Sequence, residues 1–370
     1  MSTQTDKKRG PKSSVAARIR APKLPYQPRD PKHYRPAIGL IACGGITKHH
    51  LIAYKRAGYP VIALCDPLLS RARQRQQEFY PQATVHRDYC TLLRRDDIEV
   101  VDIAAHPPAR AEIIEAALCA GKHVLSQKPF VLDLDFGQRM VDLADRRDVK
   151  LAVNQNGRWA PHFNYIHQAI LAGIIGEVSA VHLSVHWNHG WVGGTEFEKI
   201  KHLILYDFAI HWFDILSCFM RGRPLRRVYA SMARSATQKV DPPLLAQALV
   251  EYDNAQASLV FDADTQFGPQ DRTYVTGSRG SITSTGPDLK HQEVTLWTAE
   301  GRVSPKLKGC WFSDGFHGTM GELLLAIEED REPLNSGRDN LNSLALCFAA
   351  VASAERNEPV VPGEVRTMPQ

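Results

Sequence analysis

The chain has 370 residues, of which 44% are hydrophobic and 23% are charged. This length favours two domains with a cleft between them, and the composition excludes a disordered chain, which would be poorer in apolar residues. No apolar run approaches the roughly 18 residues that a membrane span requires, and the N-terminal region lacks the apolar stretch of a signal peptide. We therefore expect a cytoplasmic protein without a membrane segment.

The seven cysteines are scattered along the chain and never spaced as CxxC. An odd and irregular set predicts neither a disulfide framework nor a zinc knuckle, so a reducing compartment is expected. Three histidines near the middle of the chain, His182, His186 and His189, do not form a metal-binding helix pair, because the first two are expected on one face of a strand. No metal site is predicted.

Residues 1–36 differ from the rest of the chain in charge. They hold ten Lys or Arg residues against two Asp residues, whereas the whole chain carries a net charge of +5. Prolines recur here without apolar periodicity, which predicts a disordered, basic, Pro-rich arm that is solvated or braces a subunit. Nucleic-acid binding is not expected of it. We expect deletion of residues 1–34 to leave the fold and the activity intact.

Short apolar runs, alternating with helical spacing, come next in chain order. They cover residues 37–42, 61–65, 100–105, 122–125 and 150–153. Runs of this length, mostly unbroken by polar residues, are typical of parallel strands that helices cover on both faces. The pattern predicts an α/β Rossmann domain over residues 37–155, a doubly wound parallel sheet with its ligand at the carboxyl ends of the strands.

After about residue 155 the pattern changes to alternating strands, such as residues 178–185 and 249–252, separated by turn signals. Helical segments at residues 321–329 and 341–354 close the chain. Alternation of this kind predicts a mostly antiparallel sheet. The second domain, residues 156–370, is therefore expected to be an α+β domain for substrate binding and oligomerisation.

The first strand-to-helix turn, Cys43, Gly44, Gly45 and Ile46, is the candidate phosphate-binding turn. Of the dinucleotide pattern G-x-G-x-x-G only the middle glycine, Gly44, is in frame, so the turn alone is a weak signal. Asp66 ends the second strand 22 residues after Gly44. An acidic side chain at that place hydrogen-bonds the ribose 2′-hydroxyl and repels a 2′-phosphate, which favours NAD over NADP.

Other residues near the carboxyl ends of the strands bear on the cofactor. Arg71 and Arg73 lie near enough in sequence to Asp66 to admit a phosphate if the loop folds back. His106 and Pro107 follow the third strand, so they join the candidate cofactor-binding residues.

A resemblance rests on several short motifs taken in order. They are KHVLSQKP at residues 122–129, NGRWAP at 156–161, GIIGEV at 173–178, DFAIH at 207–211, GSRG at 277–280 and EPVV at 358–361. In their order and spacing the chain resembles the glucose–fructose oxidoreductase and inositol dehydrogenase (Gfo/Idh/MocA) family. It departs from the family at Gln127, where an acid is usual, at Ala209, and at residues 201–204, where a glycine run is replaced.

The resemblance implies a hydride-transferring enzyme whose open C-terminal sheet forms a homodimer or homotetramer. It places Gln127 and Lys128 at the cofactor, with the Lys128 ammonium between nicotinamide and substrate, where it can stabilise an alkoxide or help to move its proton. Asp207 and His211 stand four apart in an apolar helical stretch, so they are expected on one helix face. His211 can accept a proton near neutrality, and Asp207 can bind a hydroxyl or orient the imidazole. Whether Lys128 or His211 is the proton acceptor stays open.

The predicted substrate-binding residues are Asn156, Arg158, Trp159, Trp187, Asp207 and His211. Tryptophan rings can hold the C–H face of a sugar, although Trp is also a routine core residue. Arg158 can pair with a carboxylate or a cofactor oxygen, or form a surface salt bridge.

Together these patterns predict an NAD(P)-dependent dehydrogenase of a sugar, polyol or inositol-type hydroxyl. One alternative is a sugar–sugar oxidoreductase that keeps its cofactor tightly bound. Another is a non-catalytic sensor or regulator on the same fold. Retention of Lys128, Asp207 and His211 together argues against the sensor.

Overall fold

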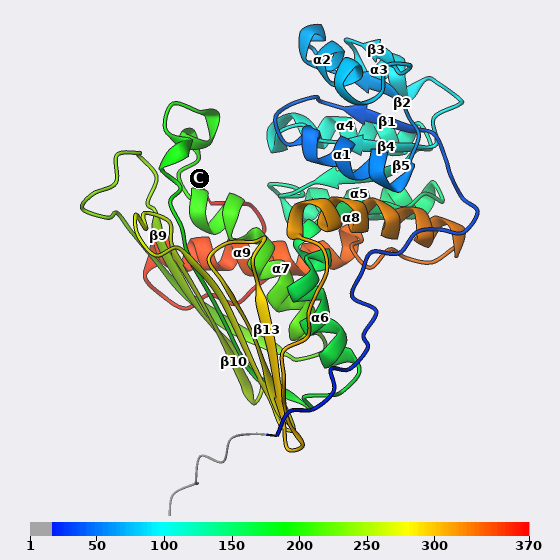
Figure 1. Ribbon diagram of the computed structural model, residues 1–370. Helices are drawn as coiled ribbons and strands as arrows, with labels where there is room; N and C mark the ends of the chain where they lie inside the picture. The colour runs from blue at the N-terminus through cyan, green and yellow to red at the C-terminus, as the bar shows by residue number, and fades with distance from the viewer. Residues whose placement is uncertain (1–16, 370) are drawn as a thin grey trace, which may run out of the picture.

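The computed structural model describes residues 17–369, which form two β-sheets with helices packed between and around them (Figure 1). The first sheet has six parallel strands in the order β3-β2-β1-β4-β5-β6. Its strands are β1 (Ile38–Ile41), β2 (Val61–Cys65), β3 (Thr84–His86), β4 (Val100–Ile103), β5 (His123–Gln127) and β6 (Leu151–Asn154). Its crossover helices are α1 (Thr47–Ala57), α2 (Leu69–Phe79), α3 (Tyr89–Leu93), α4 (Pro107–Cys119) and α5 (Leu134–Arg146).

This sheet confirms the predicted doubly wound Rossmann fold. All five predicted apolar runs form strands, and each of these strands is buried along its whole length or at all but one residue. The sequence did not indicate β3, because it has three residues and none of them is buried. Strand order reverses between β1 and β4, which places the ligand crevice at the carboxyl ends of these two strands.

The second sheet has eight strands in the order β14-β13-β12-β11-β7-β10-β9-β8. Its strands are β7 (Val178–His186), β8 (Leu225–Ala233), β9 (Leu245–Tyr252), β10 (Ala255–Asp262), β11 (Gln270–Gly277), β12 (Gly280–Gly286), β13 (Glu293–Thr298) and β14 (Gly301–Val303). Every neighbouring pair is antiparallel except β7 and β10. The predicted mostly antiparallel sheet is therefore confirmed.

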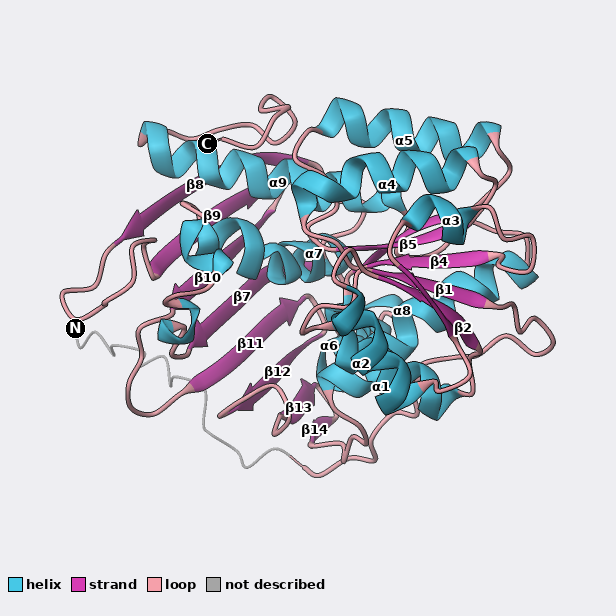
Figure 2. Cartoon of the chain, turned by 90° about the horizontal axis from the view of Figure 1, so that it is seen from above, coloured by secondary structure: helices cyan, strands magenta, loops and turns pink. Residues whose placement is uncertain are grey.

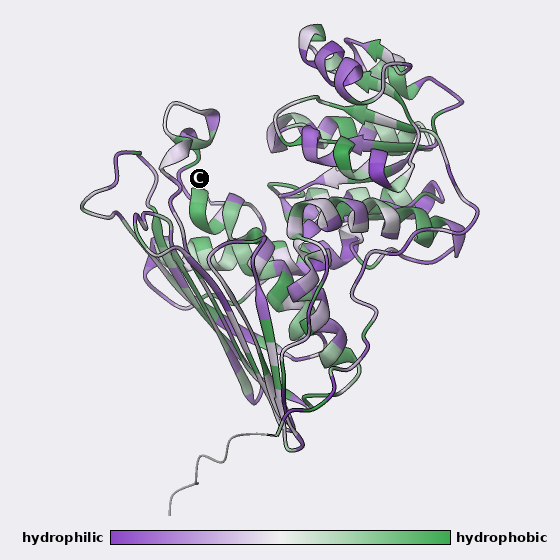
Figure 3. Cartoon of the chain, viewed as in Figure 1, coloured by the Kyte–Doolittle hydropathy of each residue, from purple (hydrophilic) through white to green (hydrophobic). Residues whose placement is uncertain are grey.

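Helices cover only one face of this large sheet (Figure 2). They are α6 (Pro161–Leu171), α7 (Ile210–Phe219) and α9 (Gly337–Arg356), and the short helical turns η1 (Asn156–Trp159), η2 (Gly190–Val192), η3 (Glu196–Lys199) and η4 (Ile204–Phe208) lie in the connections. Buried and exposed residues alternate along the strands, so hydrophobic and hydrophilic colours mix along them in Figure 3. This is the pattern of a sheet with one face in the core and one face in solvent.

The predicted boundary at residue 156 needs one correction. Helix α8 (Trp311–Glu328), which follows the large sheet in sequence, packs against α1 and beside β5 and β6 of the Rossmann sheet. Its residues Phe316, Met320, Leu323 and Leu324 belong to the hydrophobic cluster around β1 and β2. The reason is that a parallel sheet must be covered on both faces, and α8 completes the face that α1 and α2 leave partly open.

The predicted disorder of the arm is wrong for residues 17–36, and residues 1–16 lie outside the described part of the chain. The arm runs in extended form from the edge of the large sheet, where Arg18 bridges to Arg302 beside β14, up to β1 (Figure 1). On the way the Tyr165 hydroxyl donates to the carbonyl of Pro22 at 3.1 Å. Near its end the Glu328 carboxylate of α8 accepts the backbone N–H groups of residues 32–34 at 2.8, 2.6 and 2.7 Å. Hydrogen bonds from other elements order this segment, and apolar periodicity does not report such bonds.

None of the helices in the described residues combines the length and the apolar character that crossing a membrane requires.

We expect Glu328→Ala to release the arm, because three backbone N–H groups lose their shared acceptor. Limited proteolysis should then cut residues 29–36 faster than in the unchanged protein. Glu329→Ala is the matched control, since it removes an ion pair with Arg331 at 2.6 Å and a 4.0 Å contact with Arg29 but no acceptor of the N–H groups of residues 32–34. Equal cleavage rates for the two variants would contradict the expectation. For the same reason, deletion of residues 1–34 should lower the midpoint of thermal unfolding.

The same attachment should depend on pH. The three backbone N–H donors lower the pKa of the Glu328 carboxyl from 4.5 to about 2. Because the folded pKa lies below the ordinary value, the stabilisation is present above pH 4.5 and is lost as the pH falls towards 2. The protection of the N–H groups of residues 32–34 against hydrogen exchange, relative to the intrinsic exchange rate at each pH, should fall over that range and stay constant at higher pH.

Candidate active site

The turn after β1 leaves open space where a phosphate would lie. A Cβ atom added at Gly44 or Gly45 would meet no atom within 4 Å, and no side chain caps the N-terminus of α1. Ala42, just before the turn, has a positive φ of 69°. An uncapped helix N-terminus that begins at an open glycine turn is a place where backbone N–H groups can hold the pyrophosphate of a dinucleotide.

Asp66 ties this turn to the end of β2. One oxygen of its carboxylate accepts the N–H of Cys43 at 2.8 Å, and the other accepts the N–H of Leu68 at 2.8 Å. Each oxygen keeps a lone pair for a ribose hydroxyl. Burial raises the pKa of the Cys43 thiol to about 12, so Cys43 contributes its backbone rather than a thiolate. Ile46 is partly exposed beside the turn. These residues fit an adenosine ribose and a pyrophosphate.

An arginine that sequence reasoning did not name lies over the same turn. Arg75 of α2 donates to the carbonyl of Gly44 at 3.2 Å and to the Thr47 hydroxyl at 3.3 Å. Arg71 and Arg73, which were considered instead, are exposed. The sequence could have indicated Arg75 through Ala72, the buried residue of α2. Residues three positions apart lie on the same helix face, so Arg75 points to the same side as Ala72.

The loop after β5 carries Lys128, and Arg110 holds this loop through hydrogen bonds to its backbone carbonyls. The Arg110 guanidinium, almost completely buried in α4, donates to the carbonyl of Ala105 at 2.8 Å and to the carbonyls of Gln127 and Pro129. Burial lowers the pKa of Arg110 to about 10, so it stays charged at neutral pH. Its position was visible in the sequence, since Arg110 shares a helix face with the buried Ile113 and Ile114.

Gln127 turns its side chain into the protein. Its Oε1 accepts the N–H of Lys128 at 2.7 Å, and its Nε2 lies 3.1 Å from Nε2 of His50. His50 is fully buried in α1, and its Nδ1 lies 2.7 Å from the Asp102 carboxylate of β4. Both side-chain ends of Gln127 have protein partners, so the predicted cofactor contact of Gln127 is replaced by a supporting position behind Lys128.

Lys128 meets Asp207 across the boundary between the two sheets. Its Nζ donates to the backbone carbonyl of Asp207 at 2.7 Å and lies 3.4 Å from the Asp207 carboxylate. Both side chains are about one-fifth exposed. Asp207 belongs to the π-helical turn η4, and His211 lies in the first turn of α7. Asp207 and His211 therefore do not share one continuous α-helix, because Asp207 lies in a π-helical turn, a feature frequent at functional sites, and His211 lies in the α-helix that follows it.

Two histidines lie close to this ion pair. Burial and the nearby Lys128 ammonium hold the pKa of His211 well below its ordinary value. Nδ1 of His211 is buried and has no hydrogen-bond partner among the described residues, so Asp207 does not orient the ring through that atom. His189, which sequence reasoning left out of the site, packs its ring on Phe208 at 4.2 Å. Burial lowers the pKa of His189 to about 4, although the Asp207 carboxylate opposes that change.

His106 and Pro107 begin α4 at the carboxyl end of β4, on the cleft side of the Rossmann sheet. The His106 ring lies edge-on to Phe197 of η3, with ring centroids 6.0 Å apart. His106 and Pro107 therefore lie where η3, in the connection between β7 and α7, approaches the Rossmann domain.

The remaining predicted substrate-binding residues divide into two groups. Trp187 packs against Phe208 and Trp212, at 5.6 and 6.2 Å between ring centroids, and so lies beside Asp207. Asn156 accepts the indole N–H of Trp311 at 3.0 Å, and the Trp311 ring lies edge-on to His211 at 5.5 Å.

Trp159 packs closely on Gly318 of α8. A Cβ atom at Gly318 would come within 2.1 Å of the Trp159 ring, and Trp159 is 8% exposed. This ring belongs to the contact between η1 and α8.

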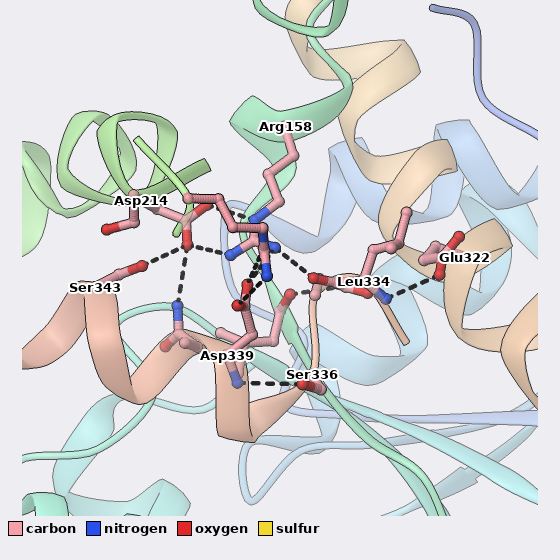
Figure 4. Close-up of polar contacts among 12 residues, drawn as sticks. Arg158, Asp214, Glu322, Leu334, Ser336, Asp339 and Ser343 are labelled. Carbon is pink, nitrogen blue, oxygen red and sulfur yellow. Dashed lines mark hydrogen bonds and ion pairs between the residues drawn. The ribbon is translucent and has the colours of Figure 1, made fainter. Parts of the chain in front are cut away.

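Arg158 has its partners within the protein. Its guanidinium forms a two-point ion pair with Asp214 at 2.6 and 2.6 Å and lies 2.8 Å from Asp339 (Figure 4). It also donates to the carbonyl of Leu334. The pair is buried, and removal of one partner from such a pair costs about 3–5 kcal/mol. The donors of Arg158 therefore hold η1 to α7 and α9, and the predicted contact of Arg158 with substrate stays a prediction.

Within residues 17–369, no group of three or more His, Cys, Asp or Glu side chains is arranged to hold a metal ion. All seven cysteines are free.

Comparisons with known proteins match both halves of the chain. Residues 37–155 match the oxidoreductase family with an NAD-binding Rossmann fold, and residues 163–283 match the GFO/IDH/MocA C-terminal domain. The chain is 27% identical over 348 residues to a D-apiose dehydrogenase of Paraburkholderia graminis, covering 87% of this chain and 88% of that protein. It is 26% identical over 330 residues to an inositol 2-dehydrogenase of Rhizobium meliloti, covering 87% and 98%.

The fold has close relatives among solved structures. An oxidoreductase from Agrobacterium radiobacter, solved in complex with NAD⁺, L-tartaric acid and magnesium, superposes with a TM-score of 0.81 at 21% identity over 89% of this chain and 99% of that one. The Rossmann sheet, the eight-stranded sheet and the two domain matches agree in order and extent, and the chain belongs to the GFO/IDH/MocA family of NAD-binding oxidoreductases.

Proposed function

We propose that this chain is an NAD-dependent dehydrogenase that oxidises a hydroxyl of a sugar, polyol or inositol-type substrate. The proposal rests on the contact of Lys128 with Asp207. This contact joins the loop after β5 of the Rossmann sheet to the π-helical turn η4 of the second domain. Names of the relatives support the substrate class, since they are dehydrogenases of D-apiose and of inositol.

The bound nicotinamide would supply the hydride acceptor. The role of Lys128 is to stabilise the negative charge that develops on the substrate oxygen, because its ammonium is fixed by the carbonyl and carboxylate of Asp207. His211, kept neutral by burial and by Lys128, has the imidazole form that accepts a hydroxyl proton. Trp187 and Trp311 provide apolar ring faces for the C–H side of the substrate.

NAD is the preferred cofactor in this proposal. The Asp66 carboxylate stands at the end of β2, fixed by two backbone N–H groups, and would face a 2′-phosphate with like charge. The cytoplasm is the proposed location, supported by cysteines that are all unpaired.

Asp66→Ser should weaken NAD and leave NADP better tolerated. The ratio of catalytic efficiencies should shift by about tenfold, since a hydrogen bond to a charged group contributes about 1.5–3 kcal/mol. Steady-state kinetics with both cofactors measures this ratio. Arg75→Ala should weaken both cofactors, whereas Arg73→Ala, an exposed neighbour on the same helix, serves as the control. A higher efficiency of the unchanged protein with NADP would refute the cofactor preference.

Lys128→Ala and His211→Ala should keep nucleotide binding and lose turnover. The two side chains act on the negative charge of the substrate oxygen, which develops only in the transition state. If His211 is the base, its loss should lower kcat by roughly 10²–10⁴-fold. His182→Ala, on the outer face of β7, is the control. With a His211 pKa well below 6.5, the acid limb of the pH profile should lie below 6.5 as well. Near-normal turnover of His211→Ala would move the proton transfer to Lys128.

We also propose that the outer face of the large sheet forms a homodimer or homotetramer contact. Tyr229 and Leu249 are cross-strand neighbours there, 42% and 59% exposed, on a face that no described helix covers. Exposed apolar neighbours of this kind mark subunit contacts.

Leu249→Asp should dissociate this assembly in light scattering coupled to gel filtration. Phe267→Asp, which changes a 91% exposed apolar residue in a loop outside that face, should leave the mass unchanged. A monomeric unchanged protein would refute the proposed contact.

A further inference from the structure

The connection between β7 and α7 carries an exposed aromatic ring that the proposed reaction does not use. Trp191, in η2, is 59% exposed. Its indole lies against the rings of His189 and Phe197, with centroids 5.7 Å apart in both pairs, so the ring is held from two sides. A ring held in this way offers solvent a fixed apolar surface, and binding to it costs little side-chain entropy.

Both rings that hold Trp191 lie at the boundary between the two domains. His189 packs on Phe208, beside the candidate active site, at 4.2 Å between centroids. Phe197 lies edge-on to His106, at the carboxyl end of β4, at 6.0 Å. Trp191 therefore lies where the second domain approaches the cofactor side of the first, one ring further from the candidate site than His189.

The backbone on both sides of Trp191 is fixed to the body of the second domain. The N–H of His189 donates to the carbonyl of Ala263, after β10, at 2.7 Å. The N–H of Val192 donates to the carbonyl of His189 at 3.1 Å, and the Val192 side chain is fully buried. The indole thus stands on a support that exists before any ligand binds.

His189 adds a polar atom beside the indole. Its Nδ1 is buried and has no hydrogen-bond partner among the described residues. Its Nε2 is not one of the buried atoms, and it too makes no hydrogen bond within residues 17–369. Burial lowers the pKa of His189 to about 4, so the ring is neutral near pH 7, and a neutral imidazole can exchange a hydrogen bond with a hydroxyl.

We propose that Trp191 and Nε2 of His189 form an outer subsite that binds the second ring of a glycoside, whose first ring is oxidised at Lys128 and Asp207. This inference rests on the proposed function. A sugar ring has apolar C–H groups on its face and hydroxyls at its edge, which matches an indole face beside one neutral hydrogen-bonding atom.

The position of the indole implies a substrate of two rings. Phe208 follows Asp207 directly, and the His189 ring lies between Phe208 and Trp191, at 4.2 and 5.7 Å between successive centroids. A single sugar ring with its hydroxyl at Lys128 lies beside Phe208 and leaves the indole uncovered. A second ring in glycosidic linkage extends the substrate along these aromatic side chains and covers Trp191.

Matched pairs of sugars test the inference. The pairs are D-glucose with cellobiose, D-galactose with lactose, and D-xylose with xylobiose. Calorimetric titration in the presence of NADH gives affinities that do not depend on turnover. For the best pair we expect the disaccharide to bind at least about tenfold more tightly than the monosaccharide, which is the scale of covering one aromatic face. Trp191→Ala should abolish this ratio, and NADH affinity should not change.

Two further variants keep the test decisive. His189→Phe keeps a ring against Phe208 and removes Nε2, so it should lower the ratio several-fold, and it covers the case in which Trp191→Ala does not fold. Leu171→Ala is the control, because this apolar side chain is 62% exposed, much as Trp191 is, but ends α6 near the turn between β11 and β12. That turn is at the end of the large sheet opposite to the connection after β7, so the ratio should not change.

Equal affinities for the two members of every pair, or no binding of either, would overturn the inference. A ratio that survives in Trp191→Ala would overturn it too, and weaker NADH binding with that ratio unchanged would assign the indole to the cofactor instead. If disaccharides bind through Trp191 but none is oxidised, the inference stands and the dehydrogenase proposal fails. Oxidation of monosaccharides without any preference for disaccharides gives the reverse result.

Discussion

The ion pair of Lys128 with Asp207 is the interaction on which the candidate site depends. It joins a loop of the Rossmann sheet to the π-helical turn before α7, where both side chains are shielded from most solvent. At a distance of 3.4 Å and in such surroundings, attraction between opposite charges is stronger than on an open surface. Burial, together with the nearby Lys128 ammonium, lowers the pKa values of His189 and His211. Two neutral imidazoles beside one balanced ion pair are suited to proton transfer with an uncharged substrate.

The Rossmann domain supports Lys128 through groups that do not touch the substrate. Arg110 binds successive carbonyls of the loop, and Gln127 receives the N–H of Lys128. The departure from the family at Gln127 is explained by its other partner. His50 donates from Nδ1 to Asp102, so its Nε2 is an acceptor that the Gln127 amide can satisfy. A glutamate at residue 127 would place an acceptor against that acceptor unless His50 took up a proton.

Periodicity in the sequence was enough to predict the parallel strands, the Rossmann domain and the antiparallel sheet, because each strand is either apolar throughout or alternates. It could not place α8 on the first domain, since that packing joins residues far apart in sequence. It also missed the ordered arm, whose contacts are hydrogen bonds from Tyr165 and Glu328 to an extended backbone. In the candidate site, family spacing indicated Lys128, Asp207 and His211, but the sequence could not indicate the ion pair of Arg158, because its partner, Asp214, lies 56 residues away in the chain.

The route of the chain limits how the two domains can move. Helix α8 follows the large sheet in sequence yet packs on the Rossmann sheet, and α9 contacts α5 on one side and α7 and β8 on the other. The arm crosses the same boundary on the surface, from β14 to Glu328 and on to β1. A hinge opening would have to strain the packing of α8, the packing of α9 and the arm. It would also have to separate Lys128 from Asp207. The side chains of Lys128 and Asp207 are therefore held in place by the packing of both domains, and binding gains from side chains that need no reorganisation.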